Sequence, residues 1–346
     1  MTIIVFLITL SVLVLAHELG HFTLARLFKM PVEEFGIGFP PRAWSWVRNG
    51  IRYSLNWLPL GGFVKIIGED SSSSDPLAFI NQKRWKRFLV LFAGVFMNFL
   101  VGWAIVLGIL TSGVRQPLAN KVPNAEEVAV QIVNVAPGTL AEQLGLRAGD
   151  EVLAVDGQAL TWADDLKIYL QTSERHEVTI RQEGMERNME VVFQPGQPKV
   201  LGVGIVTVGV IKYSWYELPM ESLKLSFGLV KQMFQGLGEI IKSAATGAGT
   251  VDVAGPVGVA AMTGQAYKLG WLAFLQFVAF LSFNLAVINV LPIPALDGGR
   301  ILFLTIETIR RKASKGIWEQ RANQIAFMLL LLLILLVTIK DIKGLW

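Results

Sequence analysis

The chain has 346 residues, of which 53% are hydrophobic and only 17% are charged. This balance is typical of an integral membrane protein and not of a water-soluble globular one. The chain contains no cysteine, which excludes disulfide bonds and cysteine-ligated metal sites. The net charge of +4 comes without an array of basic and aromatic residues, so we expect no nucleic acid partner.

Four segments are long and apolar enough to cross a bilayer, which takes about 20 apolar residues in a helix. We expect these spans at about residues 3–24, 88–110, 271–291 and 323–339. The first lacks the basic start and the cleavage site of a signal peptide, so we expect it to be retained. Residues 222–245 are rich in glycine and interrupted by charges, which indicates an amphipathic helix at the membrane surface.

Lysine and arginine are concentrated between the first and second spans and between the third and fourth. Loops rich in these residues face the cytoplasm. Both chain termini, and the long segment between the second and third spans, are therefore expected on the outer side of the membrane.

The stretch LVLAHELGHFTLARL, which begins at residue 13, places two histidines and a glutamate inside the first apolar segment. An ionisable side chain at the bilayer centre costs about 2.5–3.5 kcal/mol on insertion scales, so it is rare there and usually functional. On a helix, His17 and His21 lie on one face, one turn apart, and can bind one zinc ion. Glu18 can then act as general base on metal-bound water. A plain membrane anchor that ends before the histidines is the alternative.

A catalytic zinc ion needs three protein ligands and an open position for water. The chain has three histidines, and we expect the third, His176, to be a solvated surface residue of the outer segment. The third ligand is therefore expected to be a carboxylate. Asp297 in NVLPIPALDGGR is the best candidate, because it follows the third span on the side of the membrane where the first span ends. A plain Asp-Gly turn is the alternative.

Residues 36–67, between the first two spans, contain the strand-like run IRYSLNW followed by LPLGGFVKII. We expect a β-hairpin or small sheet that re-enters the membrane toward the zinc site. Its edge at Gly61, Gly62, Phe63 and Val64 could pair with the backbone of an unwound substrate, as in strand addition. A hairpin with only a structural role is the alternative.

The outer segment has strand-like runs at residues 129–135, 151–155, 177–181 and 189–193, with a short helix after Pro137-Gly138. The sequence GLRAGDEVLAVDG, which starts at residue 145, resembles that of a bacterial PDZ domain. We expect one PDZ domain, since no second unit of this kind is present. An unrelated small β domain with a Gly-Asp turn is the alternative.

HELGH in the first span, a PDZ-like outer segment and N-x-x-P-x-P-x-L-D-G near the end together resemble the site-2 protease family, in particular its bacterial RseP-type zinc metalloproteases. LPLGGFVK and GPVG are also similar to family segments, so the resemblance covers nearly the whole chain. It implies one Zn²⁺ ion per chain, bound by His17, His21 and Asp297, with Glu18 as the base. It also implies that Asn289 holds the substrate strand or the developing oxyanion. The chain departs from the family in reading AGVFMN in its second span, where A-G-P-x-x-N is frequent, and in having one PDZ unit where some relatives have two.

The resemblance further implies that the substrate is a single-pass transmembrane protein whose outer domain a site-1 protease has already trimmed. Anti-sigma factors and signal-peptide remnants fit this description, and the bacterial cytoplasmic (inner) membrane is the implied location, with the lipid bilayer as the other partner. A metal transporter and an inactive PDZ scaffold are the alternatives. A base next to the first metal ligand favours hydrolysis over transport, and the intact set of site residues argues against the scaffold.

The expected fold is a multi-pass α-helical membrane protein with four transmembrane helices, a membrane-associated β-hairpin and one extracytoplasmic PDZ domain. Its expected parts are an N-terminal membrane domain (1–112), the PDZ domain (113–210), an amphipathic segment (211–270) and a C-terminal membrane domain (271–346).

Overall fold

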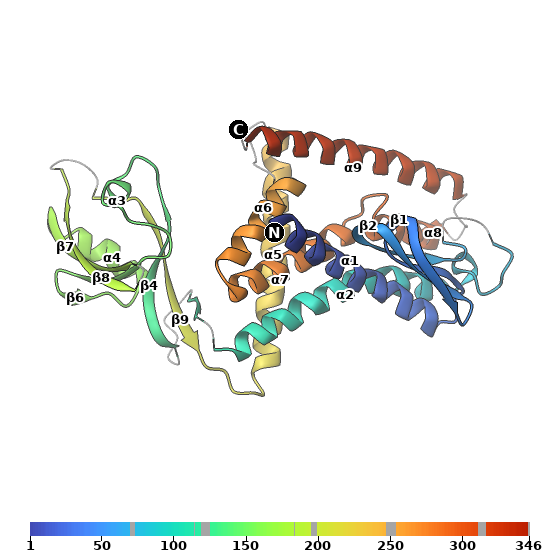
Figure 1. The fold of residues 1–346 in the computed structure, drawn as a ribbon, viewed down its shortest axis with the longest axis horizontal. Helices are drawn as coiled ribbons and strands as arrows, with labels where there is room; N and C mark the ends of the chain where they lie inside the picture. The colour runs from blue at the N-terminus through green and yellow to red at the C-terminus, as the bar shows by residue number, and fades with distance from the viewer. Residues whose placement is uncertain are drawn as a thin grey trace. The chain divides into compact units, whose positions relative to one another are not determined.

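The computed structural model describes residues 1–69, 73–113, 115–118, 125–182, 184–194, 199–246, 254–310 and 316–344. The chain divides into two compact units, one of Met1–Ile109 with Pro219–Trp346 and one of Leu110–Leu218 (Figure 1).

Within the described residues, four helices are long and apolar enough to cross a membrane. They are Thr2–Leu27, Arg84–Thr111, Trp271–Val290 and Arg321–Lys343. These helices coincide with the four predicted spans, and the amphipathic stretch at 222–245 is not one of them.

The first unit consists of helices and one β-hairpin (Figure 1). Its elements are α1 (Thr2–Leu27), β1 (Val32–Arg48), β2 (Ile51–Ile66), the 3₁₀ helix η1 (Phe79–Asn81), α2 (Arg84–Thr111), α5 (Leu218–Thr246), α6 (Pro256–Lys268), α7 (Trp271–Val290), α8 (Asp297–Arg310) and α9 (Gly316–Gly344). The region that we expected to be one amphipathic segment therefore contains two helices, α5 and α6.

Helix α1 buries one narrow stripe along its length and exposes large apolar side chains elsewhere. The buried residues are Thr9, Leu13, His17, Gly20, His21 and Ala25, and all but Gly20 recur every four positions. Exposed apolar residues such as Ile4, Ile8 and Val12 cover the other faces. Such a helix packs against protein on one side and exposes apolar side chains on the others, as a membrane span does.

Helices α1 and α2 approach closely where α1 carries a glycine. A Cβ atom on Gly20 would lie 2.4 Å from the carbonyl oxygen of Ala93, so only glycine fits there. This close contact brings the HELGH turn of α1 directly against the backbone of α2.

Helix α5 packs its apolar face against α2 and α7. Leu229, Val230 and Met233 contact a cluster that includes Phe283, and the Trp103 indole donates a hydrogen bond to Ser222 at 2.9 Å. The lysines of α5 are exposed, so the helix is amphipathic. Its place at the membrane surface stays a prediction.

Strands β1 and β2 form an antiparallel hairpin whose register runs from Val32 opposite Ile66 to Arg48 opposite Ile51. The turn residues Asn49 and Gly50 both have positive φ angles, 53° and 79°, as an Asn-Gly hairpin turn requires. Strand β2 lies along α1 (Figure 1). The prediction of a β-hairpin in this loop is confirmed.

In its described residues, the second unit is a seven-stranded sheet with two short helices. Its elements are β3 (Arg115–Pro117), β4 (Ala125–Val135), α3 (Leu140–Gln143), β5 (Glu151–Val155), β6 (Gln158–Ala159), α4 (Ala163–Leu170), β7 (Arg175–Gln182), β8 (Met185–Val192) and β9 (Val203–Ile211). The strand order is β3-β9-β4-β5-β7-β8, with β6 on β5. The predicted strands at 129–135, 151–155, 177–181 and 189–193 are found as β4, β5, β7 and β8.

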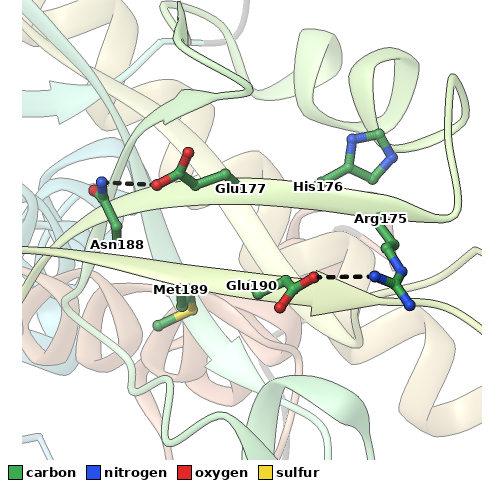
Figure 2. A pocket seen from close by; sticks show the side chains of 6 residues that line it. All are labelled: Arg175, His176, Glu177, Asn188, Met189 and Glu190. Atoms are coloured by element: carbon green, nitrogen blue, oxygen red, sulfur yellow. Dashed lines mark hydrogen bonds and ion pairs between the residues drawn. The ribbon is translucent and has the colours of Figure 1, made fainter.

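The expectation for His176 was wrong, because its side chain is fully buried. It lies on β7, where side chains alternate between the two faces of the sheet. Its neighbours Arg175 and Glu177 face partners on β8, Glu190 at 3.9 Å and Asn188 at 2.9 Å (Figure 2). The His176 ring instead lies against the Phe193 ring and the end of α4. Charged flanking residues made a buried position look polar in the sequence.

Candidate active site

His17 and His21 on α1 meet Asp297 on α8 around a single point. The Nε2 atoms of the two histidines are 3.1 Å apart, and they lie 3.0 Å and 3.3 Å from Oδ2 of Asp297. Both histidines are buried, and the Asp297 side chain is only 14% exposed. The structure thus joins the two halves of the predicted site, which are far apart in the sequence.

This triangle of ligand atoms fits a zinc ion. Tetrahedral ligands at about 2.0–2.1 Å from zinc lie about 3.3–3.4 Å from one another, close to the three observed separations. Oδ2 of Asp297 is buried and has no hydrogen-bond partner of acceptable geometry in the part of the chain that the structure describes. Two imidazoles and one carboxylate are also a donor set that zinc accepts in catalytic sites. We conclude that His17, His21 and Asp297 could hold this metal.

The second nitrogen of each imidazole contacts α2. Nδ1 of His21 donates to the carbonyl oxygen of Val90 at 2.8 Å, which leaves the Nε2 lone pair of His21 free for a metal. Nδ1 of His17 lies 3.2 Å from the side-chain amide of Asn98. The contacts of α2 with the two Nδ1 atoms therefore fix the orientation of both imidazole rings.

Gly94 of α2 also touches the site, and sequence reasoning missed it. A Cβ atom there would lie 2.4 Å from Nε2 of His21 and 2.7 Å from Nε2 of His17. The absence of a side chain at Gly94 therefore leaves the space in which the ligand atoms meet. A glycine four residues before Asn98, in the span next to HELGH, was a signal that could have been followed.

A tight turn joins α7 to α8, and Asp297 is the first residue of α8. Cβ atoms on Gly298 and Gly299 would lie 2.1 Å and 2.2 Å from the carbonyl oxygens of Leu291 and Ile293, so the turn requires both glycines. The sequence Asp-Gly-Gly therefore starts a helix in contact with the preceding chain, and is not a plain surface turn.

The far side of helix α8 is held by a buried ion pair. Arg87 of α2 donates to the Glu307 carboxylate at 3.1 Å, and both side chains are largely buried. Nearer to Asp297, Arg300 pairs with Glu69, which follows β2. These contacts fix α8, and with it Asp297, against α2 and the hairpin.

Glu18 faces the hairpin. Its Oε2 accepts a hydrogen bond from the backbone N–H of Val64 at 3.0 Å. A Cβ atom on Gly62 would lie 3.9 Å from Cγ of Glu18 and 2.8 Å from the carbonyl oxygen of Gly36. The backbone of β2 thus passes directly beside the predicted base.

The other predicted substrate-binding residues are placed as follows. Gly61 has a positive φ of 101° and lies against Val14 of α1, and Phe63 is opposite Gly36 in the hairpin ladder. Asn289 is half-buried near the end of α7.

The comparison with known proteins agrees with this geometry. Residues 5–333 match peptidase family M50. The chain belongs to this family, the site-2 proteases. The resemblance predicted from HELGH and LDG is thereby confirmed, and the chain is a peptidase of the zinc-dependent M50 class. The four apolar spans together with the family indicate a membrane protein.

Relatives match over essentially their full length. A protein of Clostridium perfringens, named as a candidate zinc metalloprotease, is 37% identical over 99% of this chain and 98% of its own. Proteins with the same kind of name from Fusobacterium nucleatum and Clostridium acetobutylicum are 33% and 31% identical. They cover 100% and 98% of this chain, and 100% and 97% of their own lengths.

Proposed function

We propose that this protein is an intramembrane zinc endopeptidase that cleaves the transmembrane segment of single-pass membrane proteins. One observation carries the proposal: His17, His21 and Asp297 bring three ligand atoms together beside Glu18, on the apolar span α1 and on α8, which follows the apolar span α7. Family membership supports the same chemistry.

In this proposal His17, His21 and Asp297 are the ligands of one zinc ion per chain. Zinc, when bound, lowers the pKa of a water ligand to near 7 and polarises the scissile carbonyl. The Glu18 carboxylate accepts the proton of the attacking water and returns it to the leaving amide nitrogen. The bond from Val64 N–H holds Glu18 in place for this transfer.

A transmembrane substrate must be unwound, because the carbonyl groups of a helix are occupied by internal hydrogen bonds. We propose that the β2 edge at Gly61, Gly62, Phe63 and Val64 receives the unwound segment by strand addition. Val64 places this edge beside the base, because its N–H points away from β1 and donates to Glu18, so a substrate strand would pair with the other backbone groups of the edge. A strand added on that edge would lie beside the base. Asn289 is the proposed donor to the substrate strand or to the developing oxyanion.

We further propose that the enzyme lies in the bacterial cytoplasmic membrane with its termini and residues 113–210 outside. The clustering of lysine and arginine in the other loops supports this orientation. The outer residues would form a PDZ domain that excludes substrates with intact outer domains, so that a site-1 protease has to act first. Deleting about 122–193 would then allow an untrimmed substrate to be cleaved.

Mass spectrometry of membrane peptides tests the proposal. Cells that express a Glu18→Gln copy should accumulate transmembrane peptides that are absent from cells with the unaltered protein. Identical peptide populations in the two strains would argue against endopeptidase activity, and zinc uptake into vesicles by the purified protein would favour a transporter.

A further inference from the structure

Asn98 is a fully buried polar residue on an apolar helix, and its side chain points at a proposed zinc ligand. Its Nδ2 lies 3.2 Å from Nδ1 of His17, while its Oδ1 is buried with no hydrogen-bond partner in the described ranges. A buried acceptor without a donor is unfavourable, so such an arrangement calls for an explanation.

The tautomer of His17 decides which atom of the Asn98 amide should face the ring. If Nε2 of His17 binds a metal, the ring proton must be on Nδ1, and Nδ1–H then needs an acceptor. The amide oxygen and nitrogen of asparagine are interchangeable by a half-turn of the side chain. After that rotation Oδ1 of Asn98 accepts the proton of His17, and Nδ2 takes the buried position that has no partner in the described residues.

The unrotated amide has the opposite effect. Nδ2–H of Asn98 then donates to the Nδ1 lone pair of His17, which leaves the ring proton on Nε2, where it blocks a metal. His21 has no such choice, because its Nδ1 faces the carbonyl oxygen of Val90, which can only accept. The two histidines therefore differ: the tautomer of His21 is fixed by the backbone, and that of His17 depends on one side-chain amide.

We propose that Asn98 is a positioning residue that accepts the Nδ1–H of His17 and so keeps its Nε2 free for zinc. This inference rests on the proposed role of His17 as a ligand. A carboxylate or carbonyl behind a metal-bound histidine fixes the ring and raises its basicity, and loss of such a partner typically lowers metal affinity about 10–100-fold.

A purely structural role for the Asn98 side chain can be separated from this one. The contact of Asn98 with α7 uses its backbone: its carbonyl oxygen accepts a hydrogen bond from Oγ of Ser282 at 2.7 Å. Substituting the side chain at this position leaves that bond in place. Removing the Ser282 hydroxyl instead breaks it and leaves the amide facing His17, which makes Ser282→Ala a matched control.

The test measures zinc affinity of the full-length protein in detergent by competition with a chelator. Asn98→Leu should bind zinc about 10–100-fold more weakly. Asn98→Asp, whose carboxylate can only accept, should bind at least as tightly as the unaltered protein. Ser282→Ala should stay within about twofold. The visible spectrum of the Co²⁺-loaded protein should change in Asn98→Leu and return in Asn98→Asp.

Unchanged zinc affinity in Asn98→Leu, or weaker binding in Asn98→Asp than in Asn98→Leu, would overturn the proposal. If the leucine variant does not fold, Asn98→Ala takes its place with the same expectations. His17→Ala tests the proposed metal site separately from the role of Asn98. If it binds zinc normally, the proposed metal site itself is wrong; if it loses zinc while Asn98→Leu does not, only the role of Asn98 fails.

Discussion

Glu18 on α1 and Val64 on β2 are joined by a hydrogen bond from the backbone N–H of Val64 to Oε2 of Glu18, 3.0 Å long. The bond couples the hairpin to the base through main-chain atoms, so the identity of the side chain at 64 should matter little. A hydrogen bond to a charged group contributes about 1.5–3 kcal/mol.

Val64→Pro removes this donor, and we expect it to lower cleavage at least tenfold while the protein keeps its zinc. Val64→Ile keeps the donor and should cleave at nearly the normal rate. A smaller loss on a substrate whose transmembrane helix contains glycine or proline would indicate that the edge also receives the substrate, because such a helix is partly unwound already. Equal rates for Val64→Pro and the unaltered protein on a stable helical substrate would refute a role for this edge in cleavage.

Gly94→Ala places a methyl group where the ligand atoms meet, 2.4 Å from Nε2 of His21. We expect zinc affinity to fall at least tenfold, measured by chelator competition. Gly108→Ala, on the same helix but with no atom beyond its own helical backbone within 4 Å of the new Cβ, is the control and should bind zinc normally. Tight zinc binding by Gly94→Ala would mean that the ligands meet elsewhere.

Removing one partner of the buried pair of Arg87 and Glu307 should destabilise the fold more than removing both. Glu307→Leu alone leaves the buried Arg87 without its carboxylate and should cost about 3–5 kcal/mol. Arg87→Met leaves Glu307 paired with Arg84 at 3.5 Å and should cost less. The double variant replaces both charges with apolar groups and should be more stable than either single variant. Thermal unfolding in detergent measures this, and additive losses in the double variant would show that the two residues act independently.

In the second unit, Nδ1 of His176 lies 2.6 Å from Oδ2 of Asp156. This bond, with a further one from the Glu177 N–H, holds the pKa of the Asp156 carboxyl below its ordinary value. A lowered folded pKa stabilises the fold above about pH 4, the ordinary value for aspartate, and the effect is lost as the pH falls through the lowered pKa.

Asp156→Asn should therefore be less stable than the unaltered protein at pH 7, by about 1 kcal/mol or less because the carboxylate is half-exposed. The difference should shrink as the pH falls below about 4. Unfolding curves of the full chain across this pH range provide the measurement. A difference that stays constant with pH would exclude Asp156 as the source of the effect.

The spans and the zinc motif could be predicted because both depend on local pattern. Length and apolarity define a membrane helix, and the spacing of His17 and His21 follows from the helical repeat. The pairing with Asp297 was also within reach, because topology limits which residues share a membrane depth. Two-residue periodicity likewise predicted β4, β5, β7 and β8.

The remainder of the site depends on how the helices pack against one another, and this packing cannot be predicted from the pattern of a single sequence. Gly94 and Asn98 become site residues only because α2 crosses α1 at Gly20. His176 was misjudged because a polar neighbourhood in the sequence can surround a buried position in a sheet. The bond between Glu18 and Val64 likewise depends on the path of β2 along α1.

The most direct test of the account is zinc content and cleavage measured together on purified variants. Substituting a proposed ligand and substituting the base should both abolish cleavage, but only the first should remove the bound zinc. His17→Ala, His21→Ala and Asp297→Ala should each lose both bound zinc and cleavage of a transmembrane substrate. Glu18→Gln should retain one zinc ion per chain and lose cleavage alone. Cleavage at the normal rate by Glu18→Gln, or a full zinc content in Asp297→Ala, would contradict the proposed active site.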